Sequence, residues 1–180
     1  NHLYLSAGRY PFASPSDIFE STDAGKTWNP LGLNRPFGAN RHPEKIGNKL
    51  CYNIFDKNEL WCATYGQGLW IYQIQEKKWR RHNFDFEGGI IQSMAFANDG
   101  KHVFVSTVDS GIYYSENQGA TFQKMKGYDW DNSDIALSSD GAYLFATSLK
   151  NGVWRFQIDD ENNGWKNITP NAEYKEYRTI

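Results

Sequence analysis

The sequence has little net charge and no long apolar segment. Its 180 residues include 19 Lys and Arg against 21 Asp and Glu, which gives a formal net charge of −2. A chain this balanced lacks the basic surface of a nucleic-acid-binding protein, so we expect no nucleic-acid partner. No apolar run approaches the roughly 18 residues that cross a bilayer, so we expect no membrane span. No segment has the pattern of a signal peptide.

Cysteines are also scarce, since Cys51 and Cys62 are the only two. They flank a predicted hairpin centred near Asp56 and Lys57, and counting from that centre places them opposite each other. A cross-strand disulfide is then geometrically possible and would indicate an oxidising compartment. The alternative is a pair of small buried apolar residues, and both interpretations remain open here. The spacing does not fit a zinc ribbon, and we expect neither a metal nor a cofactor.

Aromatic residues and glycines are abundant instead. The chain has 7 Trp, 11 Tyr and 11 Phe, which make up 16% of its residues, together with 16 Gly. Many aromatics, many glycines and few long apolar runs are typical of an all-β protein with short strands and tight turns.

A repeat organises most of the chain. In each copy a strand ends in a small residue and Thr, a short turn leads to Gly, and an aromatic-rich strand follows. The copies pair 60–64 with 68–72, 103–107 with 111–115, and 144–147 with 152–156. The glycines Gly68, Gly111 and Gly152 are 43 and then 41 residues apart, which is the length of one propeller blade.

Further strands complete this pattern. A strand precedes each copy, at 49–52, 93–96 and 134–137, and the hairpin turns that follow are centred on 56–58, 98–100 and 139–141. An earlier copy pairs 3–7 with 17–21 and lacks its first strand, and an insertion is expected within 34–45. The sequence therefore predicts an all-β propeller of about four blades, each with four antiparallel strands, as part of a larger ring.

The predicted blades form one propeller segment over 1–180. Their approximate boundaries are 1–45, 46–88, 89–130 and 131–171. The tail 172–180 is expected either to close the ring, by supplying the strand missing from the first blade, or to start another blade.

An eight-residue turn motif supports the blade assignment. Residues 21–28 match the Asp-box pattern Ser/Thr-x-Asp-x-Gly-x-Thr-Trp/Phe at every defined position, with Ser21, Asp23, Gly25, Thr27 and Trp28. A second copy has Ser115, Asn117, Gly119 and Phe122 in the matching places. Asp or Asn accepts hydrogen bonds from amides of its own loop, and Gly takes a left-handed conformation. We interpret these residues as structural, and Asp23 is not expected to act as a catalytic acid.

Taken together, these motifs resemble Asp-box (BNR-repeat) propellers. The order of features is similar to that in xyloglucanase-type glycoside hydrolases: the box at 21–28, Phe37-Gly38-Ala39-Asn40, Gly47 to Leu50, Leu60-Trp61 and Gly68-Leu69-Trp70. The likeness covers about the first 75 residues, and sortilin-like propellers are the next most similar. Sialidases are a poorer match, because the chain has no Arg-Ile-Pro segment.

The resemblance implies a site at the inner-strand ends. The family uses two carboxylates as general acid and base across a central cleft. Asp134 begins an inner strand where such an acid would lie, whereas the matching places in the other blades hold Gln92 or Ser93 and Asn48 or Lys49. The catalytic candidate is therefore Asp134, and an ordinary loop aspartate is the alternative. The ligand-binding candidates are Tyr65, Trp130, Asp131, Asn40 and Arg41.

Two functions follow from these features. The first is a carbohydrate-active, extracellular or periplasmic segment that binds or cleaves a polysaccharide or glycan at its inner-strand loops. The second is a non-catalytic propeller, sortilin-like or an assembly factor, that binds a protein partner.

Overall fold

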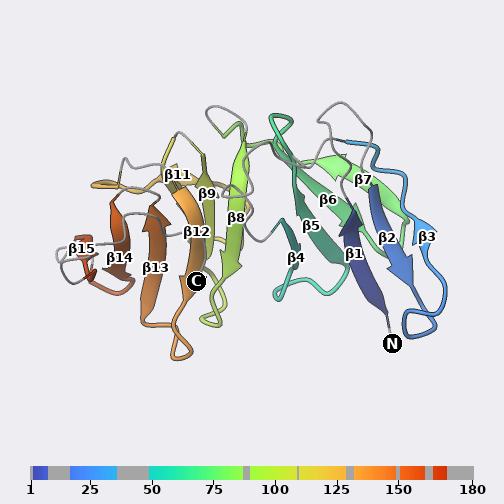
Figure 1. The fold of residues 1–180 in the computed structure, drawn as a ribbon. Coiled ribbons are helices and arrows are strands. Elements are labelled where there is room, and N and C mark those ends of the chain that lie inside the picture. The colour runs from blue at the N-terminus through green and yellow to red at the C-terminus, as the bar shows by residue number, and fades with distance from the viewer. Residues whose placement is uncertain are drawn as a thin grey trace.

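The described part of the protein is built from short β-strands. The computed structural model describes residues 2–7, 17–35, 49–86, 90–108, 110–128, 132–148, 151–160 and 164–169, and within them it has 15 strands and no helix. A helix long and apolar enough to cross a membrane is accordingly absent from these residues. The strands form four antiparallel sheets that follow one another in chain order (Figure 1).

Three of the sheets have four strands each. The first sheet has three: β1 (Leu3–Ala7), β2 (Asp17–Ser21) and β3 (Asn29–Pro30). The second has β4 (Leu50–Tyr52), β5 (Glu59–Ala63), β6 (Leu69–Gln73) and β7 (Lys78–Arg81). The third has β8 (Ile91–Phe96), β9 (Val103–Thr107), β10 (Ile112–Ser115) and β11 (Gln123–Lys124). The fourth has β12 (Asn132–Leu137), β13 (Tyr143–Ser148), β14 (Gly152–Gln157) and β15 (Lys166–Asn167).

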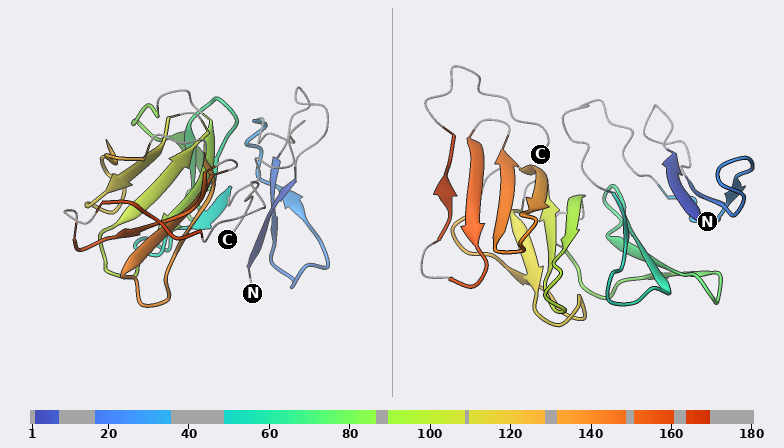
Figure 2. Two further views of the ribbon diagram at one scale, coloured as in Figure 1. Left: turned by 60° about the vertical axis from the view of Figure 1, so that its left-hand side comes forward. Right: turned by 90° about the horizontal axis from the view of Figure 1, so that it is seen from below.

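This arrangement confirms the predicted all-β propeller fold. Every strand inferred from the repeat is present within one or two residues, and each sheet runs in simple up-and-down order (Figure 2). Residues 170–180 and most of the expected insertion lie outside the described residues. The blade boundaries therefore remain a prediction.

Side-chain alternation explains why the sheets stack. Successive residues of a strand point to opposite faces, so a strand between two neighbouring sheets can supply both interfaces. In β5, Leu60 and Cys62 join a cluster with Ile18 of the first sheet, whereas Trp61 and Ala63 join a cluster with Met94 of the third. A further cluster fills the space between the third and fourth sheets. Each interface between successive sheets thus has its own apolar core.

The same alternation corrects the expectation for the two cysteines. Cys62 pairs with Leu50, and Cys51 pairs with Trp61, so the predicted register was wrong by one residue. A shift of one residue turns a side chain to the other face of a sheet. The thiols of Cys51 and Cys62 therefore belong to different clusters, and both are free. The interpretation as a disulfide is wrong.

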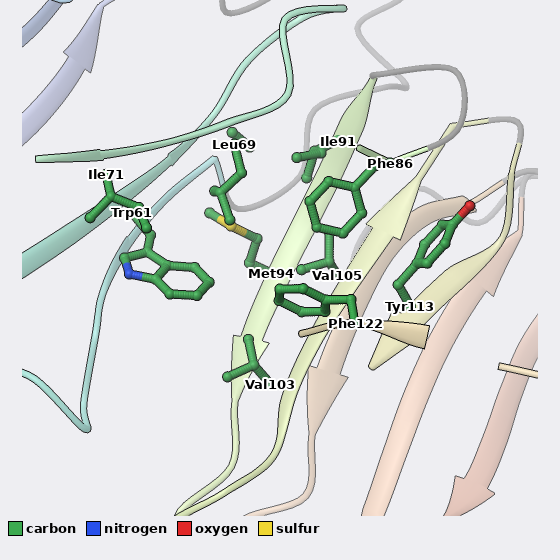
Figure 3. Close-up of a cluster of buried hydrophobic side chains, with 11 residues drawn as sticks. Trp61, Leu69, Ile71, Phe86, Ile91, Met94, Val103, Val105, Tyr113 and Phe122 are labelled. Carbon is green, nitrogen blue, oxygen red and sulfur yellow. The ribbon is translucent and has the colours of Figure 1, made fainter. Parts of the chain in front are cut away.

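Trp61 and Gly119 make a close contact between the second and third sheets. A side-chain carbon added at Gly119 would overlap the far edge of the Trp61 indole ring, so the ring packs directly on the backbone of the turn that follows β10. Figure 3 shows Trp61 on one side of Met94, with Val105 and Phe122 on the other. The indole is fixed from its other end, because its Nε1 donates to Glu59 Oε2 at 2.8 Å.

His82 reinforces this contact with a hydrogen bond between the sheets. The Phe84 amide donates to His82 Nδ1 at 3.0 Å, which assigns the proton to Nε2, and Nε2 then donates to the Gly119 carbonyl at 2.8 Å. Burial lowers the pKa of His82 and favours this neutral form. The second and third sheets are therefore joined by a packed ring and a hydrogen bond at the same turn.

Substitution of Gly119 tests this interface. Alanine at Gly119 pays the cost of a positive φ, and in addition its methyl group meets the Trp61 ring. We expect this overlap to lower the free energy of unfolding by about 1–3 kcal/mol beyond the cost of the backbone conformation. The matched control is Gly100→Ala, since φ is +83° at Gly100 and +87° at Gly119 but nothing lies near an added carbon at Gly100. Denaturant unfolding measures both variants. Equal losses would contradict the proposed close packing.

Candidate functional site

Three inner strands present equivalent residues at one end of the sheets. The backbone amide of Ala63 donates to the Lys49 carbonyl, Ser93 pairs with Ser106, and Asp134 pairs with Thr147. In each sheet, the next residue along the chain contacts the glycine of the repeat. Thr64 bonds to Gly68, Thr107 bonds to Gly111, and Ser148 pairs with Gly152. Lys49, Ser93 and Asp134 therefore occupy the same position on successive sheets. We call these three residues the inner row.

Bulges precede two members of the inner row. The register of β8 shifts between Ile91 and Ser93, and that of β12 shifts between Asn132 and Asp134. A bulge places two residues opposite one and re-aims the side chains beside it, and bulges are frequent next to functional sites. The repeated bulge is the local reason that Ser93 and Asp134 begin the regular part of their strands.

Lys49 connects the second sheet to the third. Its ammonium donates to the Ile91 carbonyl and lies 3.5 Å from Gln92 Oε1, so it bonds to the bulged segment of β8. Burial lowers the pKa of Lys49 to about 8, and the charge of Asp134 partly opposes this shift. A half-buried cation and a buried carboxylate thus flank Ser93.

Asp134 lines a cavity formed by all three inner strands. The cavity has a volume of about 520 Å³ and includes Cys51 of β4, Phe96 of β8 and Leu137 of β12. Asp134 is only 7% exposed, and its Oδ1 accepts the Ile135 amide at 2.9 Å. Among the described residues that line the cavity, Asp134 is the only carboxylate, and the other lining side chains are apolar apart from the Cys51 thiol and the Tyr52 hydroxyl.

The thiol in this cavity is not a nucleophile. Burial raises the pKa of Cys51 to about 12, and the charge of Asp134 adds to the shift. The thiol is therefore protonated near neutral pH, and its sulfur lies 3.6 Å from the Met94 carbonyl.

A second cavity lies between the outer strands of the third and fourth sheets. Its volume is about 430 Å³, and Phe104, Tyr114, Phe156, Lys124 and His102 contribute to its lining. His102 also bonds to Asp99. Burial acts to raise the pKa of Asp99, but the bonds from the amide and ring of His102 outweigh it and lower the pKa to about 2. No residue of the inner row lines this cavity, whereas Asp134 lines the first, so we place the candidate site at the first cavity.

The other predicted ligand-binding residues divide into two groups. Tyr65 follows β5, pairs with Ile90 before β8, and is partly exposed at the end of the sheets where the inner row lies. Asn40, Arg41, Trp130 and Asp131 lie outside the described residues.

Lys49 was missed as a functional candidate, because the repeat alone left its register uncertain between Asn48 and Lys49.

The Ser21–Trp28 turn is held by its own side chains. Asp23 Oδ1 accepts the Thr27 amide at 2.9 Å and the Ser21 hydroxyl at 2.9 Å, and Oδ2 accepts the Thr27 hydroxyl at 2.7 Å. The Gly25 amide donates to Ser21 Oγ at 2.8 Å, with φ of +88° at Gly25. Both carboxylate oxygens of Asp23 are thus used inside the turn.

The Ser115–Phe122 turn repeats these bonds with an amide in place of the carboxylate. Asn117 Oδ1 accepts the Thr121 amide at 2.9 Å and the Ser115 hydroxyl at 2.8 Å, while Asn117 Nδ2 donates to the Thr121 hydroxyl at 2.8 Å. Because Thr can either donate or accept, Asn can satisfy the same partners in the turn as Asp.

Both turns lie at the other end of the sheets from the inner row. Ser115 pairs with Val103, which also pairs with Phe96 at the far end of β8 from Ser93. Similarly, Ser21 pairs with Leu3 at the start of β1. The turns therefore position the strands without contributing to the cavity.

The fold defines the chain as a β-propeller segment, and comparisons with known proteins narrow this class. No protein-family model matches the sequence. The chain is 28% identical, over 96% of its length, to the probable oligoxyloglucan-reducing end-specific xyloglucanase of Neosartorya fischeri. The chain spans only 25% of the length of that relative.

Solved structures agree on the fold. The GH74 xyloglucanase of Xanthomonas campestris superposes with a TM-score of 0.78 at 22% identity, covering 95% of this chain and 29% of its own. A structure of YCF48 bound to a D1 peptide matches with a TM-score of 0.60 at 15% identity, covering 98% of this chain and 59% of its own. The chain is therefore similar in sequence and fold to xyloglucanase propellers.

The Asp23 bonds generate a pH prediction. The Thr27 amide and hydroxyl lower the pKa of Asp23 from 3.8 to about 2, so its contribution to stability is complete above about pH 4 and is lost as the pH falls toward 2. Asp23→Asn lacks this charge at every pH. We therefore expect its thermal midpoint to lie below that of the unmodified chain above pH 4 and to approach it as the pH falls toward 2. Asp23→Ala should melt lower than Asp23→Asn at pH 6, since Asn117 already shows that an amide can hold the turn. Equal midpoints for the two variants at pH 6 would contradict this account.

Proposed function

We propose that this chain forms part of the wall of a carbohydrate-binding groove, in a propeller that resembles xyloglucanase-type glycoside hydrolases. The ligand is a polysaccharide that lies across the heads of β4, β8 and β12. One observation carries the proposal: a cavity shared by three inner strands contains a buried carboxylate, in a chain that aligns with a xyloglucanase along nearly its whole length.

The chemistry of the cavity suits a neutral sugar. Ligand sites are mostly apolar and use a few placed polar groups for orientation and specificity. Here the exposed Tyr52 and Ile54 side chains of the lining can pack against the C–H face of a sugar ring, and the Asp134 carboxylate can accept its hydroxyls. Tyr65, at the same end of the sheets, is positioned to contact a neighbouring sugar.

Cleavage requires a second acidic group. Glycoside hydrolysis uses two carboxyl groups about 5–9.5 Å apart. Asp134 is the candidate acid, and none of the other described residues that line the cavity is a carboxylate. If the full protein cleaves its ligand, the partner of Asp134 comes from residues beyond the described set. Binding is therefore the function that the described residues support best.

Several further assignments belong to the same proposal. We assign the turns at 21–28 and 115–122 as Asp-box turns, and the four sheets as successive blades with the boundaries predicted from the repeat. A polysaccharide ligand also implies an extracellular or periplasmic location.

The alternative is a propeller that binds a protein partner. It is supported by the fold shared with YCF48, which was solved with a D1 peptide, but at 15% identity that likeness concerns the fold alone. The absence of any effect of glycans on the chain would favour this alternative.

Calorimetry with a xyloglucan oligosaccharide tests the proposal. We expect Asp134→Asn to weaken binding by about tenfold to a hundredfold, because a hydrogen bond to a charged group contributes about 1.5–3 kcal/mol. The matched control is Asp159→Asn, which makes the same change at an exposed turn. Amide exchange spectra establish that both variants remain folded.

Two results would contradict the proposal. The first is no heat of binding with xyloglucan or another neutral polysaccharide at millimolar concentration. The second is equal affinity of the Asp134→Asn and Asp159→Asn variants. Reducing-end analysis of the incubated oligosaccharide shows separately whether cleavage occurs.

A further inference from the structure

We propose that Lys49 is the positioning residue of this groove. Its protonated ammonium ties the head of β4 to the bulged segment of β8 and so holds the inner row in place. The effect on ligand affinity rests on the proposed function, whereas the tie itself is a property of the chain without ligand.

The geometry of the bond shows what the tie holds. The ammonium donates to the carbonyl of Ile91 and approaches the side-chain oxygen of Gln92, and Gln92 is the residue at which β8 leaves its regular register. A bulge leaves one residue outside the ladder of backbone hydrogen bonds. The Lys49 ammonium therefore adds a bond from the neighbouring sheet at the segment where the register of β8 shifts.

The charge of Lys49 makes this bond strong. Hydrogen bonds from an ionised donor are about twice as strong as neutral ones. Gln92 and Ser93 are fully buried, so the acceptor side of the bond is shielded from water. Because Ser93 follows the bulge directly, the position of the bulge determines where Ser93 lies between Lys49 and Asp134.

The protonation state of Lys49 depends on the groups around its ammonium. The titratable groups that face it are Cys62 on β5 and Asp134 on β12, and Cys51 on β4 in turn faces Asp134. Burial lowers the pKa of Lys49 to about 8, while the negative charge of Asp134 acts in the opposite direction. Lys49 consequently loses its charge just above neutral pH, and the tie weakens there.

This charge change separates positioning from simple packing. Lys49→Arg keeps a long side chain and stays charged at every accessible pH, because the guanidinium does not deprotonate. Lys49→Met keeps most of the apolar stem and removes the charge at every pH. A residue needed only for packing would give the same pH profile in all three proteins.

The first arm of the test is a titration without ligand. The NMR signals of the Gln92 side-chain amide are followed from pH 6 to 10 in the unmodified chain. We expect a transition near pH 8 that is absent in Lys49→Met and moves to lower pH in Asp134→Asn, since Asp134 supports the charge of Lys49. A Gln92 signal that titrates equally in the Lys49→Met variant would overturn the inference.

The second arm measures affinity for a xyloglucan oligosaccharide at pH 6.5 and pH 9. We expect the unmodified chain to lose about tenfold in affinity between the two, Lys49→Met to be weak at both, and Lys49→Arg to bind equally at both. Thermal midpoints and amide fingerprints show whether each variant is folded, and Lys49→Arg remains informative if Lys49→Met is not.

The outcomes distinguish the two proposals. A Gln92 transition near pH 8 without any sugar binding would support the tie and count against the proposed function. Sugar binding with the same pH dependence in the unmodified chain and in Lys49→Arg would support the function and overturn the role of Lys49.

Discussion

The contact of one tryptophan ring with one glycine determines how the second and third sheets can sit together. Trp61 reaches across the interface and lies against the backbone at Gly119, where no side chain could be accommodated. His82 bonds to the same turn from the second sheet. Interiors are packed too tightly to absorb an extra methyl group without strain, so this contact sets the distance and tilt between the two sheets.

The inner row depends on that spacing. Lys49 belongs to the second sheet, but its hydrogen-bond partners belong to the third, and Asp134 belongs to the fourth. A small rotation of one sheet against the next would separate the ammonium from the Ile91 carbonyl. The turns at 21–28 and 115–122 fix individual sheets at one end. The interface clusters fix how the sheets stack on one another. The polar residues at the opposite end of the sheets are aligned as a result.

The sequence predicted the strands much better than the contacts between them. The glycine repeat and the turn motif located all the long strands, because both follow from local chemistry: positive φ at glycine and hydrogen bonds within one turn. The register in which the strands pair was harder to predict. The hairpin between Cys51 and Cys62 was placed one residue off, and that single step exchanged the faces of both thiols. Lys49 was overlooked for the same reason, since its role depends on bulges in β8 that no local pattern marks. Asp134 was named as a candidate from the sequence, because it breaks the repeat at a recognisable position, and its role stays a prediction.

The central claim is that the heads of three neighbouring inner strands form one ligand surface. Chemical-shift mapping of the chain with a xyloglucan oligosaccharide tests it most directly, since every backbone amide reports independently. The account predicts perturbations centred on Lys49, Ser93 and Asp134, with the Ser21–Trp28 and Ser115–Phe122 turns unaffected. Perturbations centred on those turns, or on the second cavity around Phe104 and Phe156, would contradict it.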